Sequence, residues 1–204
     1  NCVLGAPSIS NFDAVYRGNI DRDGDLDLLI VRDSGTKINN LYLNNGSGTF
    51  TAIGTNPFDG IADVSVDGRF EDLNGDGYQD IIIFNSASQN YLYMNDGDST
   101  FTKSNAFGAS HNTYQVVTLD ADGDGDIDVI NGRPDESSRL YFNDGTGSFS
   151  AGSAIITNLT SNYAWVYGVA DIDGDGDEDL LGGSGDGVAS WIVRNNGDGT
   201  FGSR

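Results

Sequence analysis

Two short motifs alternate along the chain, and this internal repetition constrains the fold more than any other feature. The first is an acidic loop, Asx-x-Asx-x-Asp-Gly-x-x-Asp, which occupies residues 19–27, 72–80, 120–128 and 171–179. The second is an apolar and aromatic segment that ends in an Asn-Asx-Gly tip and a Phe, at residues 41–50, 92–101, 140–149 and 192–201. The last Asp residues of successive acidic loops are 53, 48 and 51 positions apart. Periods of this length are typical of repeat architectures. We therefore predict one repeat domain over residues 1–204, with approximate repeats 1–50, 51–101, 102–149 and 150–204.

Strand signals surround each acidic loop. Short apolar runs follow the loops at residues 28–31, 81–84, 129–130 and 180–181, and others precede them at residues 14–16, 115–118 and 165–169. Such runs, bounded by turn residues, are typical of buried strands. The second motif predicts a third strand, a tight turn at its Asn-Asx-Gly tip, and a fourth strand at its terminal Thr-Phe or Ser-Phe. No segment has a helical period, so the sequence predicts an all-β fold, a β-propeller of four-stranded antiparallel blades with four blades in this chain.

The acidic loop has the chemistry of a calcium site. Oxygen atoms from positions 1, 3, 5, 7 and 9 can converge on one point when Gly at position 6 permits a sharp turn. The predicted side-chain ligands are Asn19, Asp21, Asp23, Asp27, Asp72, Asn74, Asp76, Asp80, Asp120, Asp122, Asp124, Asp128, Asp171, Asp173, Asp175 and Asp179. The backbone carbonyls at position 7 belong to Asp25, Tyr78, Asp126 and Asp177. We expect about four Ca²⁺ ions, one per repeat, bound with Kd on the order of 10⁻⁴ to 10⁻³ M and serving to stabilise the fold.

Three other interpretations explain the loop less well. An EF-hand would need a Glu at position 12, but that position holds Ile30, Ile83, Asn131 and Gly182. A plain solvated turn explains Asp and Gly, but not the recurrence of oxygen-bearing residues at the same positions in every copy. Magnesium retains several waters and suits such an all-protein cage less well than calcium.

At these residues the chain resembles the FG-GAP / VCBS repeat family, the calcium-binding blades of integrin α-subunit propellers and of many secreted bacterial proteins. Its departures are Asn19 and Asn74 in place of Asp, Arg22 in place of Gly, and Ser99 in place of the tip Gly. Propellers of this family usually close with about seven blades, within a general range of roughly 4–8. The resemblance therefore leaves open a fragment, a four-bladed ring, half of a two-chain ring and a protomer of a longer assembly. It implies a secreted or cell-surface module for binding or adhesion, with carbohydrate or protein as the partner.

Composition excludes several other classes. Asp and Glu number 31 against 10 Lys and Arg, a net charge of −21, so nucleic acid and anionic membrane surfaces are disfavoured partners. No apolar run approaches the roughly 20 residues that a membrane helix needs. The single Cys2 and single His111 exclude an internal disulfide and a Cys/His zinc cluster. Because the chain starts Asn1-Cys2 without Met, we expect a processed or trimmed chain.

Exposed aromatic residues are the predicted carbohydrate platforms, because an aromatic face offers rigid apolar area to a pyranose ring. The leading candidates are Trp165, Tyr167 and Trp191, followed by Tyr114 and Tyr163. Trp191 occupies the position of Asn40, Tyr91 and Arg139 in the other repeats, which predicts a place at an exposed rim. Most aromatic residues of such a fold instead pack in its core.

An enzyme is the competing class. His111 is the sole histidine and no Gly-x-Ser-x-Gly motif accompanies it, so we expect no catalytic activity. The alternatives to a binding module are a self-associating structural protomer of an extracellular assembly or filament, and a non-catalytic domain of a polysaccharide-active enzyme. Asn45 and Asn158 begin glycosylation sequons, a motif with many chance matches.

Overall fold

The computed structural model divides the chain into two compact units, residues 1–110 and 111–204, and each unit contains two of the repeats. It describes residues 3–4, 14–33, 35–36, 38–58, 60, 62–86, 88–108, 113–132, 138–150, 153–154, 165–183 and 190–202. Over these residues the secondary structure is strand and turn, with no helix. Accordingly, this part of the chain has no helix long and apolar enough to span a membrane.

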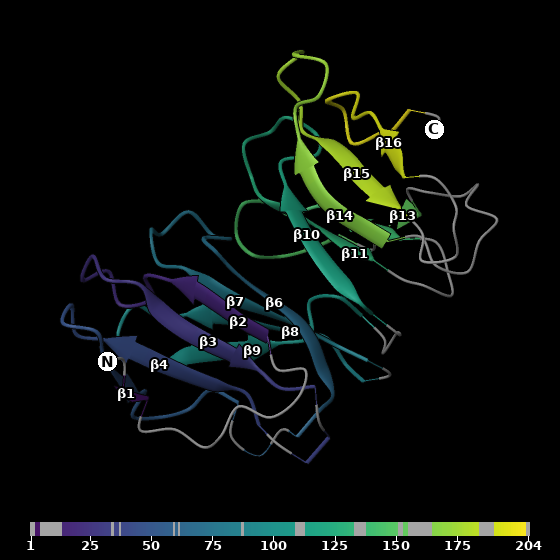
Figure 1. Ribbon diagram of the computed structural model, residues 1–204. Helices are drawn as coiled ribbons and strands as arrows, with labels where there is room; N and C mark the ends of the chain where they lie inside the picture. Colours follow the sequence, from purple (N-terminus) through teal and green to yellow (C-terminus); the bar gives the residue numbers. More distant parts are fainter. Residues whose placement is uncertain are drawn as a thin grey trace. The chain divides into compact units, whose positions relative to one another are not determined.

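The first unit contains two sheets (Figure 1). The first has the strand order β1-β5-β4-β3-β2, and the bounds are β1 Val3–Leu4, β2 Ala14–Gly18, β3 Asp27–Val31, β4 Asn40–Asn44 and β5 Thr49–Ala52. The second has the order β6-β7-β8-β9, formed by β6 Ser65–Glu71, β7 Asp80–Asn85, β8 Tyr91–Asn95 and β9 Phe101–Ser104. All neighbours pair antiparallel except β1 and β5, which are parallel.

The second unit repeats this plan with shorter strands. One sheet has the order β10-β11-β12-β13, formed by β10 Gln115–Leu119, β11 Asp128–Gly132, β12 Arg139–Tyr141 and β13 Ser153–Ala154. The other has three strands among the described residues, β14 Trp165–Ala170, β15 Asp179–Gly183 and β16 Trp191–Val193. Every pair of neighbours is antiparallel.

The predicted all-β class and antiparallel sheets are confirmed. The predicted fourth strand forms in the first two repeats as β5 and β9, but Phe149 and Phe201 make only isolated bridges, to Asn143 and Asn195. Four-stranded blades are therefore not uniform along the described chain. None of the described sheets closes on itself, and a ring of four blades remains a prediction.

Alternating side chains of the second strand join the two repeats within a unit. Leu29 and Val31 on β3 belong to the same buried cluster as Ile81 and Ile83 on β7. Because successive side chains of a strand point to opposite faces, these alternate residues place one face of β3 against one face of β7. In the second unit, Ile130 on β11 and Leu180 on β15 share a cluster in the same manner.

The fourth repeat exposes the face that the other repeats bury. Ile172, at position 2 of its acidic loop, is 43% exposed, and Ile192 on β16 is 46% exposed. The equivalent residues of the other repeats are at most 2% exposed, namely Ile20, Leu73 and Ala121 for the first position and Leu41, Leu92 and Leu140 for the second. Two apolar side chains of the last repeat are thus available to a further surface.

This difference predicts unequal effects of one truncation at equivalent positions. Leu140→Ala should lower the free energy of unfolding by about 2–5 kcal/mol, because it leaves a cavity in the core. Ile192→Ala should lower it by less than about 1 kcal/mol, because its side chain is half exposed. Urea denaturation of the two variants measures both values, and an equal loss would show that Ile192 is buried in solution.

Candidate metal centre

Each acidic loop connects the first two strands of its repeat. The loops join β2 to β3, β6 to β7, β10 to β11, and β14 to β15 (Figure 1). The last Asp of each loop already belongs to the second strand, where it pairs with the final residue of the first, as Gly18 does with Asp27 and Leu119 with Asp128. The loops are therefore tight turns whose two ends are fixed by the strand ladder.

That last Asp is a buried clamp in all four repeats. Asp27, Asp80, Asp128 and Asp179 are all 0% exposed. In each, Oδ2 accepts a hydrogen bond of 2.8–3.0 Å from the N–H at loop position 2, donated by Ile20, Leu73, Ala121 and Ile172. Oδ1 accepts one of 2.8–2.9 Å from the first Asn of the second motif, donated by the N–H groups of Asn44, Asn95, Asn143 and Asn195. One carboxylate thereby ties the acidic loop to the second motif.

Burial changes the acidity of the clamps in the first three repeats. Desolvation raises the pKa of Asp80 and that of Asp128 to about 6, although the two backbone N–H bonds on each carboxylate partly oppose the shift. The pKa of Asp27 is also raised, again mainly by burial. Nearby loop carboxylates raise these pKa values further. A cation in the loop would act in the opposite direction, since it favours the ionised form.

The first Asp of the loop shapes the turn. In three loops this residue is Asp72, Asp120 or Asp171, and its carboxylate accepts hydrogen bonds of 2.7–3.2 Å from the N–H groups of the glycines at positions 4 and 6. Position 4 has positive φ in all four loops. The first loop places Arg22 there, with φ 61°. Its backbone follows the same course although Arg has replaced Gly.

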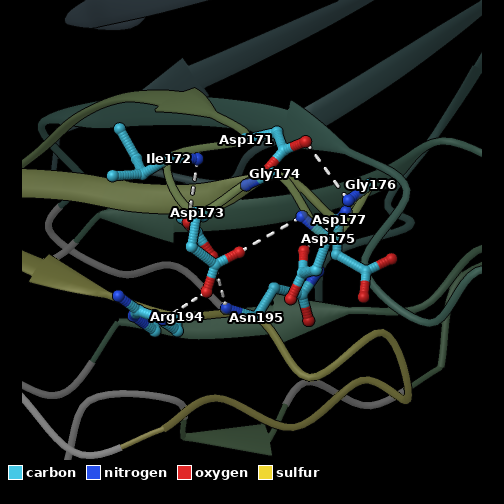
Figure 2. Close-up of polar contacts among 10 residues, drawn as sticks. Asp171, Ile172, Asp173, Gly174, Asp175, Gly176, Asp177, Arg194 and Asn195 are labelled. Atoms are coloured by element: carbon cyan, nitrogen blue, oxygen red, sulfur yellow. Dashed lines mark hydrogen bonds and ion pairs between the residues drawn. The ribbon is translucent and has the colours of Figure 1, made fainter.

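Loops three and four bring carboxylates together as a cation site requires. Asp120, Asp122 and Asp124 offer oxygen atoms within 4.8 Å of one another, and so do Asp171, Asp173 and Asp179. Figure 2 shows the fourth loop. These are hard oxygen donors on one short turn, which is the donor type that calcium takes.

One oxygen of the third loop lacks the partner that a buried acceptor needs. Asp122 Oδ1 is buried and has no hydrogen-bond partner among the described residues. Burial, followed by the charge of Asp124, raises the pKa of Asp122. An unsatisfied buried carboxylate oxygen is costly, and a bound cation would supply the missing interaction. The residues of this loop therefore fit a metal ion.

Loops one and two do not group three carboxylates in this way among their described residues. Each has one Asn where the other loops have Asp. Asn19 Oδ1 is buried without a hydrogen-bond partner in the described part of the chain, whereas Asn74 donates to Asp76 Oδ2 at 2.9 Å. Of the four predicted sites, the described residues therefore bring three carboxylates together in the third and fourth loops, and not in the first and second.

The tip glycine of the second motif has a role that its sequence context did not suggest. Its φ is positive in each repeat, as expected of a turn, at Gly46, Gly97, Gly145 and Gly197. It also makes room for the side chain at loop position 7. A Cβ on Gly145 would lie 2.6 Å from Asp126 Oδ2, and one on Gly97 would lie 3.0 Å from the Tyr78 ring. Only a residue without a side chain allows the loop and the tip to approach this closely.

The predicted aromatic platform is wrong at Trp191. Its side chain is 4% exposed and packs in the core of the second unit with Val117 and Leu140, so no face is open to a sugar ring. Trp165 and Tyr167 lie on β14, but their side chains are outside the described part of the structure, as are Cys2, His111, Asn158 and Tyr163. Tyr114 is 48% exposed, and Asn45 is also exposed.

The FG-GAP-like repeat sequence model matches three overlapping segments, residues 19–83, 72–131 and 120–182. Each segment starts at position 1 of an acidic loop and extends beyond the final Asp of the next loop. The family model therefore repeats along the chain at the same interval as the two motifs, and each match begins at an acidic loop. No curated protein sequence matches the chain significantly.

Solved structures with a similar fold include a lectin, a toxin and a biofilm matrix protein. An Agrocybe aegerita lectin that recognises non-reducing terminal N-acetylglucosamine matches with a TM-score of 0.65 and 22% identity, over 93% of this chain and 50% of the lectin. The Photorhabdus luminescens Tc holotoxin pore matches with a TM-score of 0.53 and 15% identity, over 92% of this chain and 9% of the toxin chain. The V. cholerae biofilm matrix protein matches with a TM-score of 0.53 and 21% identity, over 92% of this chain and 27% of that protein. This chain therefore spans half or less of each, and at these identities the likeness is one of fold.

The raised pKa values of the clamps predict how stability depends on pH when metal is removed. The folded-state pKa values of Asp80 and Asp128, about 6, exceed the ordinary value of 3.8, so protonation favours the folded state. Their contribution is fully present below about pH 4 and is lost as pH rises through about 6, by about 1–3 kcal/mol per group. Chemical denaturation in chelator at several pH values measures this fall. Asp80→Asn should make it shallower, and an unchanged slope in that variant would refute the assignment.

Proposed function

The chain belongs to the FG-GAP-like repeat family, and we propose that it is a secreted or cell-surface binding module whose acidic loops hold structural calcium. The observation that carries the calcium assignment is the grouping of three carboxylates, with oxygen atoms within 4.8 Å of one another, in each of two loops. The proposal includes no catalytic activity. Its parts are the metal, the binding partner and the state of assembly.

Electrostatics favours a cation in these loops. Two carboxylates about 5 Å apart repel by roughly 3 kcal/mol at an effective dielectric of about 20. Three of them on one turn would push the loop open unless a divalent ion lay between them. In the third loop the ion would be held by Asp120, Asp122 and Asp124, and in the fourth by Asp171, Asp173 and Asp179. Asn19 and Asn74 reduce the charge of the first two loops, which we expect to bind more weakly.

Calcium would act on the fold through the clamp. Asp179 belongs to the carboxylate group of the fourth loop and also accepts the N–H groups of Ile172 and Asn195. An ion that binds this carboxylate would hold it in the position in which it accepts both hydrogen bonds. Metal binding and the connection between the two motifs would therefore stabilise one another.

Carbohydrate or an extracellular protein is the proposed partner. In support, a lectin and a biofilm matrix protein share the fold over more than nine tenths of this chain. The net charge of −21 argues against polyanionic partners. Trp165 and Tyr167 are the aromatic candidates for sugar contact, whereas Trp191 is buried.

A structural protomer is the second candidate, and the exposed face of the fourth repeat favours it. Ile172 and Ile192 occupy positions that other repeats bury, at 43% and 46% exposure. A surface that suits a repeat of the same type could receive one from a second copy of the chain. Such a head-to-tail contact would produce rings or filaments.

Native mass measurement in calcium and in EDTA tests the metal and the assembly together. We expect at least two bound ions in calcium and none in EDTA. If free calcium exceeds Kd about tenfold, each site contributes roughly 1.4 kcal/mol, so two sites should raise the melting temperature by about 5–10 °C. Asp122→Asn combined with Asp124→Asn should remove about half of this shift. An identical melting temperature in calcium and EDTA would contradict a structural metal, and a monomeric mass in calcium would contradict the protomer.

A glycan array tests the partner. We expect binding in calcium to a subset of glycans, with ligands that end in N-acetylglucosamine as the first to inspect, and loss of binding in EDTA. Trp165→Ala should abolish this binding if the residue forms a platform, while Tyr114→Ala serves as a control at another aromatic residue. A blank array for a protein that binds calcium and is fully folded would exclude a lectin and leave a protein partner.

A further inference from the structure

A guanidinium group from outside the fourth acidic loop forms an ion pair with one of the loop's carboxylates. Arg194 directly follows β16, and its Nη1 donates a hydrogen bond to Asp173 Oδ2 in an ion pair (Figure 2). The Arg194 side chain is 62% exposed, whereas that of Asp173 is 20% exposed. The cation therefore reaches from solvent onto a carboxylate that belongs to the candidate calcium site.

The third loop offers a direct comparison, because its position-3 carboxylate lacks this partner. In the second motif, the residue equivalent to Arg194 is Phe142, and in the first two repeats it is Leu43 or Met94. Asp122, which is equivalent to Asp173, has an Oδ1 that is buried and has no hydrogen-bond partner in the described structure. The fourth loop is thus the one in which this position of the second motif supplies a positive charge.

Both oxygens of Asp173 are already engaged. Oδ2 binds Arg194, and Oδ1 accepts the N–H of Asp175 at 3.3 Å. A calcium ion that uses Asp173 must displace the guanidinium or share the carboxylate with it, and it also meets the repulsion of a neighbouring positive charge. The third loop presents neither obstacle through Asp122.

We propose that Arg194 is a resident cation of the fourth loop and makes it a weaker calcium site than the third; this inference depends on the calcium assignment of the proposed function. The ion pair neutralises part of the fourth loop when calcium is scarce. The third loop then binds calcium first, and the fourth binds only at higher concentration. Arg194 sets this order without contacting the third loop's carboxylates.

A calcium titration followed by two-dimensional NMR of the whole chain separates the loops. The amide of Gly125 donates to Asp120 and that of Gly176 donates to Asp171, so their signals report the third and fourth loops individually. In the unmodified chain we expect the Gly176 midpoint at about three- to tenfold higher calcium than the Gly125 midpoint. Arg194→Gln should lower the Gly176 midpoint by a similar factor and leave the Gly125 midpoint unchanged.

Arg194→Lys is the matched control, because it keeps the charge at an exposed position and should keep the Gly176 midpoint near its original value. Phe142 is not substituted, since it packs against the core of the second unit. If both glycines respond to calcium but Arg194→Gln leaves the Gly176 midpoint in place, the role of Arg194 is refuted and the calcium assignment stands. If neither glycine responds, the calcium assignment fails together with this inference.

Discussion

The structure depends on one buried carboxylate in each repeat. A carboxylate that is 0% exposed must replace its lost hydration, and it does so with two backbone N–H donors, one from the acidic loop and one from the second motif. Removing either donor would leave a buried charge with an unsatisfied oxygen, which costs several kcal/mol. The two motifs therefore recur together because one residue needs both.

This requirement explains the regular distances in the chain. The clamp carboxylate and the Asn that it binds are 17, 15, 15 and 16 residues apart in the successive repeats. Those residues must form the second strand, its connection and the third strand, and return the Asn to the level of the loop. The tip glycine adds a second restriction, because position 7 of the loop packs against it, as Asp126 does on Gly145. Loop and tip are thus a single structural unit built from two segments.

Sequence reasoning predicted the acidic loops, most strands and the repeat, since each depends on local pattern. The clamp itself was missed, although the nearly constant gap between the motifs was its signal. Trp191 was misplaced because its position holds Asn40, Tyr91 and Arg139 in the other repeats, a mixture that indicates no burial. The short strand β16 turns this ring into the core. The Arg194–Asp173 pair spans 21 residues and depends on side-chain direction, which the motif does not encode.

The four repeats share a backbone but differ in charge at the loops. Of the 31 acidic residues, 18 lie in the acidic loops. Arg22 nevertheless stands in the first loop, with its guanidinium 4.8 Å from the centre of the Tyr78 ring of the second, and Arg194 neutralises part of the fourth. The third loop has no such neighbour among the described ion pairs and retains an unsatisfied buried oxygen on Asp122. Calcium in loops three and four would change the net charge from −21 to −17, since two ions add +4. The fold reuses one loop geometry throughout. On the proposed calcium assignment, single substitutions at positions 1, 3 and 4 and in the second motif would be enough to grade these loops from strong to weak cation sites.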